Sequence, residues 1–186
     1  MIGYAFTGSF CTHWQSVKYL EALCKQGADV VPIMSEVVYN TDTRFGTAEK
    51  LISTVENLCN KRVIHTVKDA EPFGPSVPLE LLIISPCTGN TLAKIAHGIT
   101  DTAVCMSAKA HLRQDRNLLI ALASNDAMSA NLKNIGTLLN RKNVYFVPMR
   151  QDDIKKKPHS LVADFSLLEE SYTAALNSIQ PRPLFI

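Results

Sequence analysis

Short apolar runs alternate with helix-like segments along the chain, and this alternation limits the fold more than any other feature. The runs lie at residues 2–7, 28–34, 81–85, 118–123 and 144–147. Between them, aliphatic side chains recur at helical spacing, at residues 17–24, 48–58, 92–96 and 130–139. Runs that are apolar throughout are typical of strands buried on both faces of a parallel sheet, with helices as crossovers. We therefore expect an α/β fold with a Rossmann-like, doubly wound parallel sheet in three α/β/α layers.

The rest of the chain predicts a short edge strand, two loops and a final helix. Val63 and Ile64 predict a short edge strand, whereas residues 71–75 contain two prolines and a glycine and predict a loop. We expect residues 144–147 to be the last strand and residues 150–165 to be an extended loop, followed by a C-terminal helix over residues 166–178. A length of 186 residues suits a single domain, 1–186.

Composition argues against several classes of function. The formal charge of +2 does not favour a nucleic-acid partner, and no apolar stretch approaches the ~20 residues that cross a bilayer. The N-terminus lacks the features of a secretory signal. The five cysteines are scattered and form no C-x-x-C pair, and the five histidines show no metal-binding spacing. We expect a cytoplasmic protein with no metal site.

Polar residues gather where predicted strands end. Doubly wound sheets bind their ligands outside the carboxyl ends of the strands. At these ends lie residues 7–9, Ser35, residues 85–91 and residues 124–126. We therefore expect the functional site at this edge of the sheet.

Thr7, Gly8 and Ser9 follow the first strand and precede a helix. Hydroxyl groups, a tight glycine turn and a helix N-terminus together suit a phosphate group. The segment is not the G-x-G-x-x-G dinucleotide fingerprint. The alternative is a helix cap without a ligand, since Ser and Thr are preferred caps.

Residues 85–91 form the densest polar segment and also separate a buried strand from a helix. They include Pro86, Thr88, Gly89, Asn90 and Thr91, whose polar groups suit the rim of a flat heterocycle or a phosphate. The alternative is an ordinary strand-to-helix turn.

Cys87 is our one candidate for a reactive group, because a thiol at a helix start can have a lowered pKa. The alternative is that Cys87 is a small spacer.

Two groups of cations suit anionic ligands. Arg44 lies in a polar segment after the second strand, and its planar fork matches a carboxylate. The alternative is a surface ion pair between Arg44 and Asp42. Lys109 and Arg113 share one face at helical spacing, which suits a dianion, although a solvated helix face is the usual explanation of such a pattern.

These motifs resemble the flavoprotein superfamily, which includes peptidyl-cysteine decarboxylases and flavin prenyltransferases. The matching segments are residues 7–9, Ser35, residues 86–91 and residues 94–101. The resemblance implies a fold of the flavodoxin/flavoprotein type and an FMN site. The first segment would receive the phosphate, Ser35 would lie near the flavin, and residues 86–91 would contact the ring system. Arg116 stands where prenyltransferases have a phosphate-contacting arginine. Relatives build this site between subunits of a trimer, so a homo-oligomer is implied.

One departure from the superfamily bears on the reaction. The decarboxylases carry a catalytic histidine at the start of the loop before the strand that leads to the segment 86–91. This chain has Glu71 and Pro72 there, and His65 lies too far upstream to replace that histidine. The departure argues against decarboxylation of a cysteinyl carboxylate.

A narrower resemblance exists to one branch of the superfamily, the B subunits of dipicolinate synthases. It rests on residues 41–46, 70–75, 88–90, 151–153, 157–158 and 160–163. The resemblance implies a partner, the A subunit of the synthase, that carries NADP. The two subunits together would oxidise dihydrodipicolinate, or its hydrated precursor, to dipicolinate in the mother cell of a sporulating bacterium.

A flat substrate with two carboxylates needs cations at both ends. Under this resemblance Arg44 would hold one carboxylate, and Lys109, Arg113 or Lys157 would hold the other. No residue is identified as a general base. Two alternatives stay open: a non-catalytic scaffold or substrate-binding protein, and a prenyltransferase-like or decarboxylase-like enzyme that acts without the A subunit.

Overall fold

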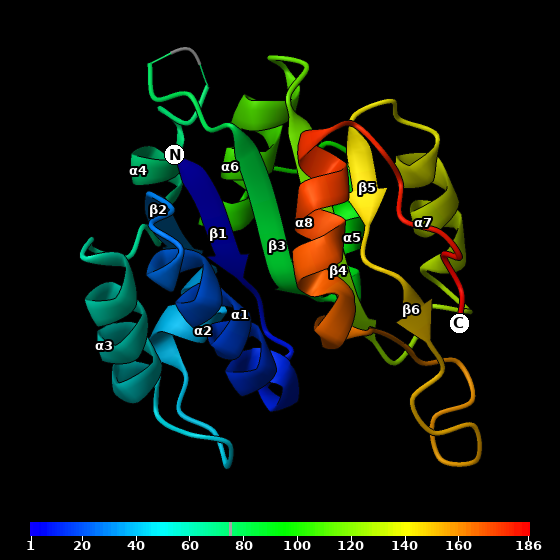
Figure 1. Ribbon diagram of the computed structural model, residues 1–186. Coiled ribbons are helices and arrows are strands. Elements are labelled where there is room, and N and C mark those ends of the chain that lie inside the picture. Colours follow the sequence, from blue (N-terminus) through cyan, green and yellow to red (C-terminus); the bar gives the residue numbers. More distant parts are fainter. Residues whose placement is uncertain (75) are drawn as a thin grey trace.

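Five parallel strands form the centre of the molecule (Figure 1). The structure is a computed structural model that describes residues 1–74 and 76–186. The strands are β1 (Ile2–Phe6), β2 (Val30–Met34), β3 (Leu81–Cys87), β4 (Asn117–Ser124) and β5 (Val144–Phe146). They lie in the order β2-β1-β3-β4-β5, and almost every residue in them is buried. The expected α/β fold is confirmed.

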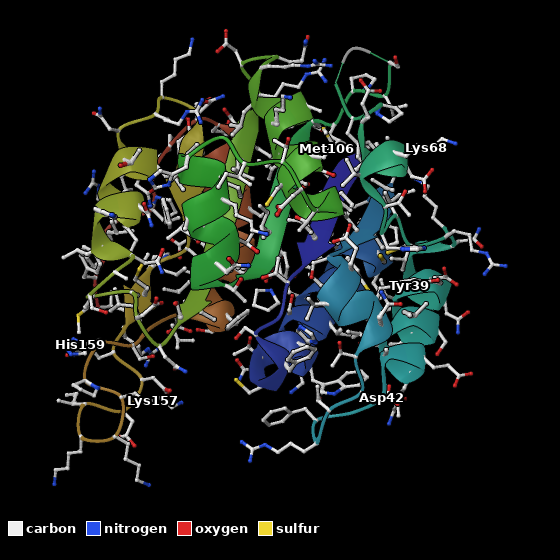
Figure 2. The ribbon with its side chains drawn as sticks, turned by 180° about the vertical axis from the view of Figure 1, so that it is seen from behind. Tyr39, Asp42, Lys68, Met106, Lys157 and His159 are labelled. Atoms are coloured by element: carbon white, nitrogen blue, oxygen red, sulfur yellow. The ribbon has the colours of Figure 1, made fainter. Side chains whose placement is uncertain are left out.

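Helices cover both faces of this sheet (Figures 1 and 2). One face packs against α1 (His13–Lys25), α2 (Glu36–Asn40), α3 (Ala48–Cys59) and α8 (Leu168–Leu176). The other face packs against α4 (Val67–Ala70), α5 (Gly89–Ala96), α6 (Ala103–Leu112) and α7 (Leu132–Leu139). Short 3₁₀ helices, η1 (Phe10–Thr12) and η2 (Phe165–Leu167), precede α1 and α8. Each face therefore has its own hydrophobic core, as a three-layer arrangement requires.

The region after β5 differs from the prediction. Residues 150–165 are not a continuous loop, because β6 (Met149–Arg150) and β7 (Leu161–Ala163) form an antiparallel pair there. β7 also pairs antiparallel with the last residues of β4, so the sheet is mixed at this end. Strands of two or three residues are too short to show a periodic pattern, and their partners are distant in sequence. As a result, the loop 151–160 leaves the sheet at the carboxyl end of β4.

Smaller differences concern the edges of the fold. The predicted strand at Val63 and Ile64 is reduced to one bridge, between Ile64 and Ile33. Residues 71–74 form turns, as expected, while Pro75 lies outside the described residues. β3 runs two residues further than predicted and ends at Cys87. Within the described part of the chain, no helix is long and apolar enough to cross a membrane.

A buried histidine makes the stability of this fold depend on pH. His111 of α6 is fully buried, and its Nε2 donates to the carbonyl oxygen of Asn117 at 2.6 Å. Its Nδ1 has no partner in the described part of the chain. Burial lowers the pKa of His111 to about 4. The folded protein therefore keeps His111 neutral under conditions in which the unfolded chain binds a proton.

We expect acid to destabilise the protein through His111. The unfolded histidine has a pKa of about 6.5, so the unfolded state binds more protons between about pH 6.5 and 4. The free energy of unfolding should fall across this window by up to about 3 kcal/mol. Urea unfolding at pH 7.5 and pH 5 measures the fall. His111→Gln should reduce it, whereas His159→Gln, in an exposed loop, should not. Equal pH dependence in wild type and His111→Gln would contradict this explanation.

Candidate functional site

A cavity of about 830 Å³ opens at the carboxyl ends of β1, β3 and β4. Cavities of ~300–1,000 Å³ are typical of small-molecule and cofactor sites. Two loops extend from this edge. Figure 2 labels one residue in each of them, Asp42 and Lys157. The lining includes Gly8, Ser9, Arg44, Thr88, Gly89 and Lys157, all of which the sequence predicted as site residues. It also includes Cys11, Phe45, Ser124, Asn125, Asp126 and Asp152.

Thr7 ties two walls of the cavity together from beneath. Its buried hydroxyl donates to the carbonyl oxygen of Pro86 at 2.8 Å and accepts from the backbone N–H of Thr88 at 2.9 Å. His13 donates from Nε2 to the Thr7 carbonyl oxygen at 2.8 Å, which requires the proton on that nitrogen. The Thr7 hydroxyl thus donates one hydrogen bond and accepts one hydrogen bond within the protein. Thr7 positions the loop and does not line the cavity.

Backbone donors in the cavity region are available for a ligand. In the described residues, the N–H groups of Phe10 and Cys11, at the start of η1, donate to no acceptor. The same holds for the N–H groups of Gly89 and Asn90 at the start of α5. Unpaired N–H groups at helix N-termini favour anions. Together with the Ser9 hydroxyl, they provide two places where a phosphate or carboxylate can bind.

The other predicted residues of the turn support the cavity from behind. The Thr88 hydroxyl caps α5 by accepting from the Thr91 N–H at 3.2 Å, and it donates to the Thr91 hydroxyl at 3.1 Å. Thr91 and Pro86 are buried, and the side chain of Asn90 is exposed. Ser35 is buried at the start of α2. None of these four residues, Ser35, Pro86, Asn90 or Thr91, is part of the cavity lining.

The loop that carries Arg44 is held by a hairpin and a tryptophan. Thr43 and Gly46 exchange two backbone hydrogen bonds, at 3.0 and 3.1 Å. Trp14 of α1 donates from its indole nitrogen to the Phe45 carbonyl oxygen at 3.2 Å. The Arg44 guanidinium lies 4.9 Å from the centre of the Phe45 ring. The loop thereby places an arginine at the cavity on a stable support.

The ion pair considered between Arg44 and Asp42 does not form. Asp42 instead accepts from the backbone N–H of Ala48 at 2.8 Å, at the start of α3. No carboxylate among the described residues lies within ion-pair distance of Arg44. The guanidinium is therefore available to a ligand carboxylate.

Lys157 enters the cavity from the opposite loop. Its ammonium group pairs with the Asp152 carboxylate at 2.6 Å, and both side chains are partly exposed. The backbone N–H of Met128 donates to the His159 carbonyl oxygen at 2.9 Å and ties this loop to the turn after β4. Lys157 is the only one of the three predicted partners of Arg44 that lines the cavity.

Lys109, Arg113 and Arg116 lie at the other edge of the sheet. Lys109 and Arg113 are at the end of α6 and line a separate cavity of about 180 Å³ with Arg141. Arg116 precedes β4 and donates to the Gly74 carbonyl oxygen at 3.4 Å. The eight residues of β4 separate this edge from the main cavity by roughly 23 Å. The structure does not bring these three cations to the main cavity of the same chain.

Cys87 does not have the expected properties of a reactive thiol. It is fully buried, and burial raises the pKa of its thiol, so the prediction of a lowered pKa was wrong. The interpretation as a small spacer fits the structure. The thiol that lines the cavity is that of Cys11, which is exposed. In the described residues, no group of three or more His, Cys, Asp or Glu side chains could hold a metal ion.

Asp126 is the site residue that the sequence analysis did not select. One carboxylate oxygen accepts from the Ser124 hydroxyl at 2.5 Å, and the other accepts from the Asn131 side-chain amide at 3.0 Å. A Cβ atom built on Gly89 would lie 2.7 Å from the Asp126 carboxylate, so only glycine leaves room for it. The sequence did contain a pattern that points to Asp126, because the polar residues 124–126 directly follow a buried strand.

Comparisons with known proteins identify the family of this chain and agree with its fold. The family model described as Flavoprotein matches residues 1–180. The B subunit of dipicolinate synthase from Bacillus subtilis is 38% identical over 185 residues, which covers 100% of this chain and 92% of the relative. The crystal structure of the B subunit of dipicolinate synthase from Bacillus halodurans has a TM-score of 0.90 at 38% identity, covering 100% of this chain and 95% of that one. A dodecameric FMN-dependent UbiX-like decarboxylase from Escherichia coli shares the fold, with a TM-score of 0.61, 21% identity and 80% coverage of each chain.

Proposed function

Because this chain belongs to the Flavoprotein family, we propose that it acts as the B subunit of a dipicolinate synthase. With the A subunit, which carries NADP, it oxidises dihydrodipicolinate or its hydrated precursor to dipicolinate in the cytoplasm of a sporulating mother cell. The observation that carries the proposal is the 38% identity to such a B subunit over the whole chain. The TM-score of 0.90 to a second such protein supports it.

The cavity has the charges that this substrate needs. Arg44 and Lys157 stand on two separate loops and line the same space. A flat ring with two carboxylates can place one carboxylate at each cation, and the guanidinium can bind its partner with two hydrogen bonds. Lys109 and Arg113, at the far edge of the sheet, do not take part within one chain. The chain thus orients the ring and excludes water from it.

The cavity also suits FMN. Its volume, the Ser9 hydroxyl and the unpaired N–H groups at the starts of η1 and α5 fit a phosphate and a flat ring system. In our proposal Gly8, Ser9, Thr88 and Gly89 face the cofactor. Bound flavin would supply a flat face beside the substrate ring, while the NADP of the A subunit would accept the hydride. The FMN-dependent decarboxylase with the same fold supports this assignment.

A homo-oligomer would explain the predicted residues that lie outside the cavity. Asn90 and Arg116 do not line it within one chain, and neither is buried. In an assembly of three chains or a multiple of three, they could complete a site of a neighbouring copy. The dodecameric relative supports such an arrangement.

Two alternatives follow from specific observations. Glu71 stands where the decarboxylases carry their catalytic histidine, and Cys87 is buried with a raised thiol pKa, which favours a substrate-binding scaffold. The fold shared with a UbiX-like decarboxylase favours an enzyme that acts alone. An absorption titration with FMN, followed by assays with and without the A subunit, separates them. A colourless protein that still supports the activity of the A subunit indicates the scaffold.

We expect Arg44→Ala to weaken dipicolinate binding to the complex of both subunits by about 10- to 100-fold. A hydrogen-bonded charged group contributes about 1.5–3 kcal/mol, and Arg44 has no carboxylate partner within the described protein. Calorimetric titration with dipicolinate measures the change. Lys155→Ala is the matched control, because Lys155 is an exposed cation outside the cavity lining. Unchanged affinity in Arg44→Ala would exclude Arg44 as a carboxylate ligand.

A further inference from the structure

We propose that Asp126 is the general base that removes a proton from the ring carbon of the substrate. This inference rests on the proposed function and assigns a role that the family resemblance does not supply. It depends on three features of the cavity: which titratable groups line it, how Asp126 is held, and what Gly89 leaves open.

The titratable side chains in the lining leave one unpaired carboxylate. They are Cys11, Arg44, Asp126, Asp152 and Lys157. Arginine and lysine are cations that bind carboxylates, and Asp152 is paired with Lys157 at 2.6 Å. Asp126 forms no ion pair with any residue that the structure describes. It is therefore the carboxylate of the cavity that no cation of the described protein neutralises.

A chain of hydrogen bonds orients this carboxylate. The Ser124 hydroxyl donates to one oxygen at 2.5 Å, and the Asn131 amide donates to the other at 3.0 Å. Asn131 is held in turn by Asn134, which donates to its side-chain oxygen at 2.8 Å, and both asparagines are buried. A carboxylate oxygen has two lone pairs, so each oxygen retains one for another partner. The group is positioned before the substrate arrives, as general bases require.

Gly89 keeps the space around this carboxylate open. A Cβ atom there would overlap the Ser124 hydroxyl oxygen and would lie 2.6 Å from the Asn131 amide nitrogen and 2.7 Å from Asp126. All three distances are shorter than real Cβ contacts. A side chain at position 89 would therefore displace the hydrogen-bonded arrangement of Ser124, Asp126 and Asn131 at the start of α5.

The proposed step conserves atoms and electrons. A dihydropyridine loses two hydrogens when it becomes aromatic. One C–H bond breaks with its electron pair, and the hydride passes to the oxidised nicotinamide dinucleotide of the partner subunit. The adjacent C–H bond breaks, its electrons form the new ring double bond, and the proton passes to an Asp126 carboxylate oxygen. Water then takes the proton from Asp126.

The test uses the complex of both subunits with Asp126→Asn, which keeps the size and the polarity of the side chain. We expect kcat to fall by ~10²- to 10⁴-fold, as for other general bases. The affinity for dipicolinate, measured by calorimetry, should stay within about threefold, because binding depends on Arg44 and Lys157. The deuterium isotope effect from the carbon that loses the proton should rise. Added formate should restore part of the activity of Asp126→Ala. Asp115→Asn, an exposed aspartate at the other end of β4, is the matched control.

Four results would contradict either the role of Asp126 or the proposed function. If Asp126→Asn keeps more than one tenth of the activity, Asp126 is not the base. If kcat and dipicolinate affinity fall together, Asp126 is a binding residue, and the inference is also wrong. If formate does not raise the activity of Asp126→Ala, proton transfer to this position is not what was lost. A wild-type complex that forms no dipicolinate would overturn the proposed function, and with it this inference.

Discussion

Thr7→Val is expected to lower the free energy of unfolding by about 2–3 kcal/mol and to disable the cavity. Valine keeps the shape of threonine but lacks the hydroxyl, so the partly buried N–H of Thr88 loses its acceptor. The carbonyl oxygen of Pro86 loses one of its two donors. An unsatisfied buried polar group costs about 1–3 kcal/mol. Urea unfolding of the two proteins measures the difference.

The effect on function follows from where these bonds lie. Thr7 joins the loop after β1 to the turn after β3, and both loops line the cavity. Without the hydroxyl the two loops are no longer held at a set distance, and the affinity for FMN should fall. Thr7→Ser is the matched control, since it keeps the hydroxyl and should restore most of the stability and the binding. If Thr7→Val unfolds like the wild type, the hydroxyl does not hold the cavity together.

Gly89→Ala is expected to have the second large effect. A methyl group at position 89 would overlap the Ser124, Asn131 and Asp126 side chains, at 2.7 Å or less. Overpacking of this kind typically costs about 1–3 kcal/mol. Displacement of Asp126 should also reduce the activity of the complex by about 100-fold, within the range for loss of a general base. Urea unfolding and steady-state kinetics measure the two effects.

Two further variants show whether steric overlap is the cause. Gly136→Ala, in the exposed face of α7, meets no atom within 4 Å and should stabilise the protein by about 0.5–1 kcal/mol. Gly89→Ala combined with Ser124→Ala removes the shortest contact and should recover part of the lost stability. If Gly89→Ala is also stabilising, the space at position 89 is larger than the structure indicates.

The position of polar residues after the strands predicted where the main cavity opens, but not which polar groups face it. The sequence placed polar segments after the strands now identified as β1, β3 and β4, and the cavity opens at those ends. It could not tell a hydroxyl that faces a ligand from one that is used within the protein. Thr7 was predicted to contact the cofactor, and its hydroxyl proves to bond the backbones of Pro86 and Thr88. Such bonds join residues up to 81 positions apart, and no local pattern shows them.

The predicted anion-binding cations also show the difference between what the sequence predicts and what the packing of distant segments decides. Arg44 was predicted to hold one carboxylate, and Lys109, Arg113 or Lys157 was predicted to hold the other. The direction of α6 places Lys109 and Arg113 at the amino edge of the sheet, while the short strands β6 and β7 return the chain so that Lys157 faces Arg44's cavity. Strands of two and three residues have no recognisable period, so their contribution was not predictable.

The sequence by itself determined the fold class and the edge of the sheet where the main cavity opens. Both depend on the order of apolar and polar residues along the chain, and a parallel sheet converts that order directly into buried strands and exposed strand ends. Only the tertiary structure decided which polar groups meet there. It paired Asp152 with Lys157, buried Cys87, and set Asp126 against the space that Gly89 leaves open. Those outcomes depend on contacts between distant segments, which form only when the chain is packed.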